Sequence, residues 1–266
     1  MRTRWAPLEL VRKLRGEATM PVASAALVTA QDHGLMDETP DPALLSRRGG
    51  FSSHGEDAAI MAVLNQRGVW RPVGFYVDVG AFHPFLFSNT AALSLLGWRG
   101  INVEPNPDMA ERLRRARPDD VTLEAAAGAS AGRAELQMFS EWGSSNTLDL
   151  GFADMISTTQ HVAVTRKVDV AVMTLLDVLD GRVPRDGIID VLSVDVEGLD
   201  LDVVCSNDWD RFRPEVVAVE DLNLDLSNVR SSPTHQFMTS VGYEMAAHVV
   251  LTSLYVPVAG SHSGSP

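Results

Sequence analysis

The alternation of short β-branched runs with stretches of helical periodicity is the feature that most constrains how this chain can fold. From about Phe51 onward, apolar runs of strand length are separated by segments whose apolar residues recur every three or four positions. A strand followed by a helix and then by another strand implies a parallel pair joined by a crossover. The run 188–194 is almost continuously apolar, as expected for a strand covered on both faces. The sequence therefore predicts an α/β fold built on a mostly parallel sheet.

The predicted elements continue this alternation to the end of the chain. Ser88 or Asn89 caps the first predicted crossover helix, Gly97 ends it, and Pro107 begins the second. The segments 243–248 and 253–258 are close enough in sequence to pair as an antiparallel hairpin at the edge of the sheet. Further strands are predicted at 74–79, 100–103, 121–126, 134–139, 167–172, 188–194 and 215–219, and further helices at 175–179, 199–205 and from Ser232 or Thr234 to 241.

Three parts of the chain are expected from composition. Residues 51–260 have the length of one enzyme domain, and the Gly- and Ser-rich residues 261–266 are predicted to fray. Residues 1–50 form an N-terminal extension that is partly helical or disordered. Its first twenty residues carry five basic and two acidic side chains, and the apolar residues among them recur at helical spacing: Trp5, Leu8, Val11 and Leu14. This pattern fits either a helix for peripheral contact with a membrane or partner, or a poorly ordered tail.

Charge and cysteine content exclude several classes of function. A net charge of −13 opposes binding to a phosphate backbone, so nucleic acid is not an expected partner. The single cysteine, Cys205, excludes an internal disulfide and a cysteine-based zinc site, which fits a reducing cytoplasm. The sequence has no apolar run of 18 residues, so no transmembrane segment is predicted.

Acidic residues gather where the predicted strands end, which is where open parallel sheets bind ligands. Between 186 and 225 there are twelve acidic residues and only two basic ones, Arg211 and Arg213. This excess favours a metal ion or a cationic cofactor. Asp200, Asp202, Asp208 and Asp210 are interpreted as acids that solvate helix starts and loops. The acids at strand ends are Asp78, Glu104, Asp195 with Glu197, and Glu220 with Asp221.

The segment 75–84 resembles a nucleotide-cofactor loop that keeps only the first glycine, Gly80. Without the second and third glycines it lacks the usual cradle for a pyrophosphate, so nicotinamide dinucleotide binding is only an alternative. Glu104 lies about one strand–helix–strand unit downstream. This is the spacing at which an acidic residue binds the hydroxyls of an adenosine ribose.

Five segments in fixed order carry a resemblance to a known family. They are VDVGAFHP at 77–84, SNT at 88–90, GWRGINVEPNP at 97–107, DVEG at 195–198 and VAVED at 217–221. Together they resemble the FkbM-type S-adenosylmethionine-dependent methyltransferases over residues 51 to about 258. The resemblance implies a class I methyltransferase (Rossmann-like) fold, with a seven-stranded sheet and an antiparallel final hairpin. It also implies S-adenosylmethionine as cofactor, and a positively charged methyl donor agrees with the acidic strand ends.

The resemblance also implies which residues bind the cofactor. Asp78 and Gly80 would lie beside its methionine end and Glu104 on its ribose, while a packing role is the alternative for Ala125 and Ala126 near the adenine. An upstream motif, S-Q-x-G-E-D, is matched at 52–57 with Ser53 in place of Gln, and its acids equally fit the start of a helix. The expected cofactor-binding residues are Asp78, Gly80, Ala81, Asn89, Glu104, Pro105 and Ala126.

The expected reaction is methyl transfer to a hydroxyl of a sugar, a glycan or a polyketide-like metabolite. Asp195 with Glu197 is predicted to act as general base or to bind a divalent metal, with Glu220 and Asp221 next and His54 or His83 as further proton acceptors. The polar segment 141–165 is either a lid over the site or a surface insertion. A nicotinamide-dependent oxidoreductase and a cofactor-binding scaffold without turnover are the alternative functions.

Overall fold

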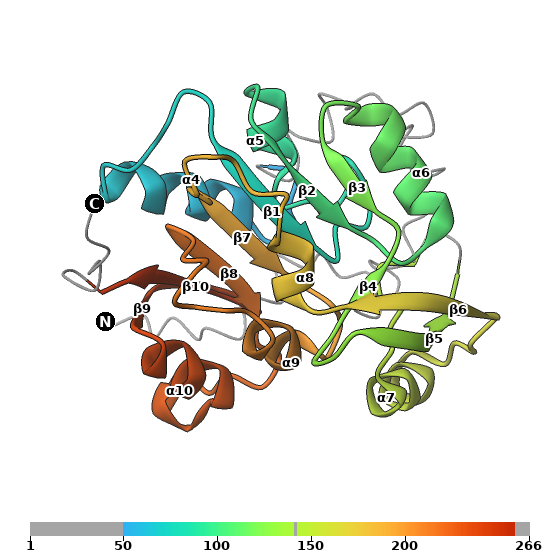
Figure 1. The fold of residues 1–266 in the computed structure, drawn as a ribbon. Coiled ribbons are helices and arrows are strands. Elements are labelled where there is room, and N and C mark those ends of the chain that lie inside the picture. The colour runs from blue at the N-terminus through green and yellow to red at the C-terminus, as the bar shows by residue number, and fades with distance from the viewer. Residues whose placement is uncertain (1–49, 141–142, 259–266) are drawn as a thin grey trace, which may run out of the picture.

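The computed structural model describes residues 50–140 and 143–258 (Figure 1). The predicted N-terminal amphipathic helix and the frayed tail at 261–266 lie outside the described residues. Within the described ranges, no helix is both long enough and apolar enough to cross a bilayer.

A seven-stranded sheet forms the centre of the fold, in the order β3-β2-β1-β7-β8-β10-β9. Only β10 is antiparallel to its neighbours, so β9 runs with the other strands and forms the outer edge. The predicted α/β fold with a mostly parallel sheet and an antiparallel final hairpin is confirmed. The strands are β1 Phe75–Val79, β2 Arg99–Val103, β3 Val121–Leu123, β7 Val191–Val194, β8 Val216–Glu220, β9 Tyr243–Val249 and β10 Thr252–Pro257.

Helices cover both faces of this sheet because its buried strands carry apolar residues on both sides (Figure 1). Val77 and Val79 of β1 pack in the cluster that holds α8, α9 and α10, whereas Tyr76 packs in the cluster that holds α4 and α5. The alternation follows the two-residue period of a strand. The helices are α4 Glu56–Gln66, α5 Ala91–Leu95, α6 Pro107–Ala116, α7 Leu150–Gln160, α8 Leu175–Leu179, α9 Asp200–Cys205 and α10 Pro233–Ser240, with a 3₁₀ turn at Val229–Ser231.

A second sheet of three strands, in the order β4-β6-β5, stands beside the first: β4 Ala126–Ala127, β5 Gly132–Met138 and β6 Arg166–Met173. It corrects the prediction of one strand over 121–126. The main-sheet strand ends at Leu123, and Ala126 pairs with Val172 of β6 instead. Between Leu123 and Ala126 the chain therefore passes from the main sheet to the second sheet. The small residues Ala125–Ala127 are buried at this crossing.

The polar segment 141–165 contains a helix that the sequence analysis overlooked. Asp149 caps α7 by accepting hydrogen bonds from the amides of Gly151 and Phe152 at 2.7 and 3.1 Å. Phe152 and Ile156, at helical spacing, pack against Phe139 after β5. The surrounding serines and threonines hid this short apolar face.

The close packing of β1 on β2 gives a first testable prediction. A Cβ at Gly100 would overlap the Tyr76 ring and its carbonyl oxygen, whereas a Cβ at Gly132 in β5 meets nothing within 4 Å. We expect Gly100→Ala to lower the free energy of unfolding by about 1–3 kcal/mol, because the strands must separate. Gly132→Ala, the control, should change it by less than about 1 kcal/mol. Urea unfolding measures both, and equal stabilities would contradict this account of the packing.

Candidate active site

The centre of the site is the turn after β1, where the order of the strands reverses between β1 and β7. Gly80 has a φ of 81°, and a Cβ there would overlap the carbonyl oxygen of Asp195. The Gly80 amide donates to the Val103 carbonyl at 2.9 Å, and the Asp195 amide donates to the Val79 carbonyl at 2.9 Å. The ends of β1, β2 and β7 are therefore joined through one residue that must be glycine.

A cleft with about 540 Å³ of empty volume opens at these strand ends. Its wall combines the turns after β1, β2 and β7 with the residues between the two sheets and with the polar loop at 143–148. No lysine or arginine is among its lining residues in the described part of the chain. Six residues expected from the sequence line it: Gly80, Glu104, Pro105, Ala126, Asp195 and Glu197.

Glu104 is held in place on the cleft wall. Its Oε2 accepts a hydrogen bond from the Phe82 amide and its Oε1 from the Asn106 amide, each at 2.8 Å. Burial raises the pKa of Glu104 from 4.5 to about 8, although the two backbone bonds oppose this shift. Each carboxyl oxygen keeps a second lone pair, so the group is oriented to accept hydrogen bonds from a ligand hydroxyl.

The turn after β7 is similarly fixed. Glu197 and Gly198 have positive φ angles of 58° and 111°, and Asp200 accepts hydrogen bonds from the amides of Val196 and Gly198 at 2.9 and 3.2 Å. Thr147 Oγ1 from the polar loop donates to the Glu197 carbonyl at 2.8 Å. The interpretation of Asp200 as an acid that merely solvates a helix start is wrong, because the residue is only 5% exposed and holds this turn together.

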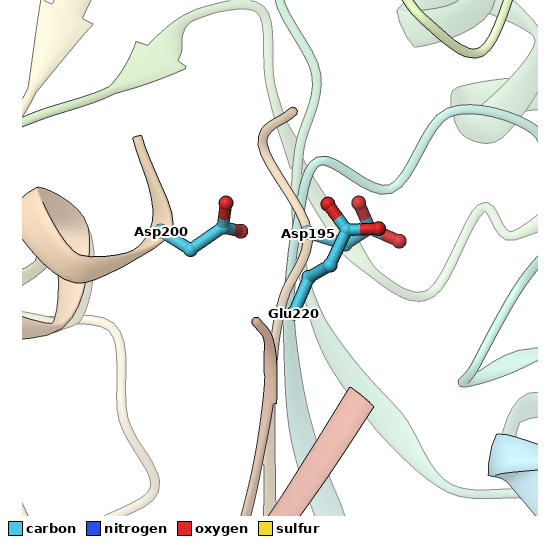
Figure 2. A group of neighbouring side chains, drawn as sticks. All are labelled: Asp195, Asp200 and Glu220. Atoms are coloured by element: carbon cyan, nitrogen blue, oxygen red, sulfur yellow. The ribbon is translucent and has the colours of Figure 1, made fainter. Parts of the chain in front are cut away.

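Three carboxylates converge beside this turn, from the half-buried Asp195 and from the buried Asp200 and Glu220 (Figure 2). One oxygen atom from each lies within 4.8 Å of the others. Burial is the main cause that raises the pKa of all three, and repulsion from nearby carboxylates, within the group for Asp195 and Glu220 and from Asp221 for Asp200, adds to it. Full ionisation of the group is therefore opposed, and a nearby cation would favour it.

The upstream motif at 52–57 forms the start of α4, which is one of its two expected roles. Asp57 begins α4 and accepts from Ser52 Oγ at 2.7 Å and from the Phe51 amide at 2.8 Å. The charge of Glu56 raises the pKa of Asp195 and of Glu220, which places this acid next to the group of carboxylates. His54, 40% exposed at its side chain, lies with Nδ1 3.2 Å from Glu56 Oε1 and is not among the residues that line the cleft.

Three further residues expected at the cofactor are packed behind the cleft wall. Asp78 accepts from Thr90 Oγ1 at 2.5 Å, and Asn89 Nδ2 donates to Ser193 Oγ at 3.0 Å. The Ala81 amide donates to the Val103 carbonyl at 3.1 Å. These contacts support the turn, and none of the three residues lines the cleft.

His83 has a structural setting. Its Nδ1 accepts from the amides of Phe85 and Leu86 at 3.1 and 3.0 Å, and burial lowers the pKa of the ring to about 3. It therefore stays neutral and shapes the chain after Gly80. Sequence reasoning missed the Phe82 amide that holds Glu104, since a backbone donor leaves no signature in residue type.

The sheet order and a cleft at its switch point define a Rossmann-like α/β fold, in which ligands bind at this position. Within that fold class, residues 78–245 match the family model of the methyltransferase FkbM domain. The chain belongs to this family and is a methyltransferase. The upstream motif at 52–57 precedes the matched residues. Among curated proteins, none matches the chain significantly.

The raised pKa of Glu104 gives a prediction about pH. The folded protein holds a proton on Glu104 up to about pH 8, whereas the unfolded chain loses it near pH 4.5. The contribution of Glu104 to the free energy of unfolding is fully present below pH 4.5 and is lost as pH rises toward 8. The free energy of unfolding falls by at most about 1.4 kcal/mol per pH unit for this group. Glu104→Gln should flatten the fall of unfolding free energy between pH 5 and 8, as urea titrations would measure. Glu124→Gln, at an exposed strand end, should leave the slope unchanged, and equal slopes in both variants would refute the assignment.

Proposed function

We propose that this methyltransferase uses S-adenosylmethionine and transfers its methyl group to a hydroxyl oxygen of a sugar, glycan or polyketide-like acceptor. The observation that carries the proposal is the oriented carboxyl group of Glu104 in a cleft whose described lining residues include acids and no lysine or arginine. A ribose diol needs such an acceptor, and a sulfonium is favoured by such a field.

The cleft fits this cofactor in three respects. Glu104 would bind the ribose hydroxyls, and the tight turn at Gly80 would let the backbone approach the methionine end. Pro105 and Ala126 would border the adenine, beside the small residues Ala125 and Ala127. Bound in the cleft, S-adenosylmethionine supplies a methyl group activated by a positively charged sulfur. Asp78, Ala81 and Asn89 would act indirectly, by supporting the turn that bears Gly80.

The acceptor hydroxyl must lose its proton, and the cleft offers two acids for this step. Asp195 and Glu197 both line the cleft, and burial together with neighbouring acids raises the pKa of each. A base is most effective when its pKa lies near the working pH, so a raised value suits a carboxylate for this role. We assign Asp195 as the base, with Glu197 beside it. His54, which is hydrogen-bonded to Glu56 and lies outside the cleft lining, would receive the proton on its way to solvent.

Two alternatives are separated by experiment. A nicotinamide-dependent oxidoreductase lacks support, because the turn after β1 has no second or third glycine and the chain belongs to a methyltransferase family. A scaffold that binds cofactor without turnover would keep the same cleft. Incubation with isotopically labelled methyl donor and a panel of glycans and hydroxylated metabolites, followed by mass spectrometry, distinguishes an enzyme from a scaffold by the labelled product.

Cofactor binding gives the third prediction. Glu104→Ala should weaken binding of S-adenosylmethionine at least about tenfold, because the diol loses its hydrogen bonds to the carboxyl group, which are worth about 0.5–1.5 kcal/mol each. Isothermal titration calorimetry of the pure protein measures this. The matched control is Glu124→Ala, a carboxylate at the exposed end of β3 that is not among the residues lining the cleft. Unchanged affinity in Glu104→Ala, with circular dichroism showing the fold intact, would contradict the assigned pocket.

Catalysis gives the fourth prediction. Asp195→Asn keeps the shape of the side chain and removes the base, so kcat should fall by roughly 10²–10⁴-fold while cofactor affinity changes much less. Steady-state kinetics with an acceptor found in the labelling screen, together with calorimetry, separates the two effects. Full activity in this variant would remove Asp195 from the reaction.

A further inference from the structure

The group formed by Asp195, Asp200 and Glu220 has the composition and placement of a cation site (Figure 2). The three residues come from the end of β7, the start of α9 and the end of β8, so separate elements bring them together. One oxygen of each lies within 4.8 Å of the others. Carboxylate oxygens are the preferred ligands of hard divalent cations such as Mg²⁺, Mn²⁺ and Ca²⁺. We propose that these three carboxylates bind one hard divalent cation at the inner edge of the cleft.

The strongest support comes from Glu220. Its side chain is 8% exposed, and its Oε2 is buried without a hydrogen-bond partner. An unsatisfied buried polar atom costs about 1–3 kcal/mol, and more when the group is charged. Figure 2 shows the Glu220 carboxyl group next to that of Asp195, with the Asp200 carboxyl group extending toward them. A cation in this group would satisfy the free oxygen.

Charge balance points the same way. The charges that raise the pKa of Glu220 belong to acids: Asp195, Glu197, Asp200 and Glu56. In the described part of the chain, no lysine or arginine forms an ion pair with Asp195, Asp200 or Glu220. Buried carboxylates are ordinarily paired or coordinate metals. These three carboxylates have no basic partner among the described ion pairs, so a bound cation would supply the balancing positive charge.

Rigidity makes the group suitable for coordination. Asp200 is fixed by the amides of Val196 and Gly198, and Asp195 is tied to β1 through its own amide. Ligands held by their surroundings lose little freedom when a cation binds.

Asp195 belongs to both the carboxylate group and the cleft wall. If the proposed methyl transfer is correct, a cation at this position would lie beside the acceptor and lower the pKa of its hydroxyl, so that Asp195, whose own pKa the cation would also lower, could still accept the proton. This consequence rests on the proposed function, whereas cation binding does not.

The test uses the full chain after treatment with a chelator, with Mn²⁺ as the probe and no methyl donor present. We expect electron paramagnetic resonance to detect one bound Mn²⁺ in the unsubstituted protein. Glu220→Gln and Asp200→Asn should each weaken binding at least about tenfold. Asp202→Asn removes the same charge from an exposed position on the same helix, and it should bind Mn²⁺ as the unsubstituted protein does. Absence of bound Mn²⁺, or equal affinity in Glu220→Gln and Asp202→Asn, would overturn the site.

A second measurement does not depend on whether a variant folds. Electron–nuclear double resonance of the unsubstituted protein, labelled with ¹³C at its Asp and Glu carboxyl carbons, should show carboxylates bound to Mn²⁺. Absence of that coupling would also overturn the site. Glu104→Ala should bind Mn²⁺ normally. Loss of its methyl donor binding therefore tests the cofactor pocket, and loss of Mn²⁺ binding in Glu220→Gln tests the cation site.

Discussion

The contact between Gly80 and the backbone at Asp195 is the constraint on which the rest of the structure depends. It leaves no room for a Cβ, and the hydrogen bonds around it join the ends of β1, β2 and β7. Because these strands are parallel, their ends meet at one edge, so one close approach brings Glu104 and Asp195 to the same cleft. The cleft is a consequence of how tightly the central strands pack.

Electrostatics then gives this cleft its character. Asp195, Glu197, Asp200 and Glu220 are acids whose burial opposes ionisation, and the charge of a neighbouring acid raises the pKa of each one further. Without a cation the folded protein retains protons there that the unfolded chain releases, which lowers its stability as pH rises. The same unbalanced charge favours a sulfonium or a divalent cation. Functional sites commonly sacrifice stability in this way.

Much of the architecture could be predicted because it follows local patterns. Pro107 begins α6 and Ser232 caps α10, as their spacing indicated, and the strand at 191–194 is buried on both faces. The predicted strand over 121–126 was wrong because its apolar residues do not reveal that Ala126 pairs with a different sheet. The helix α7 was overlooked because polar residues surround its short apolar face. Pairing partners distant in sequence leave no local signal.

The sequence by itself determined most of the alternation of strands and helices, the acids that end the strands and the membership in a methyltransferase family, since these reside in residue type and spacing. Tertiary structure alone decided which acids meet. Asp200 is buried beside Asp195 and Glu220, and Glu56, from the start of the domain, lies close enough for its charge to raise the pKa of Glu220. Asp78 instead bonds to Thr90 behind the cleft wall. The physical reason is that electrostatic coupling and burial depend on distances in space, which only the packing of the strands and helices sets.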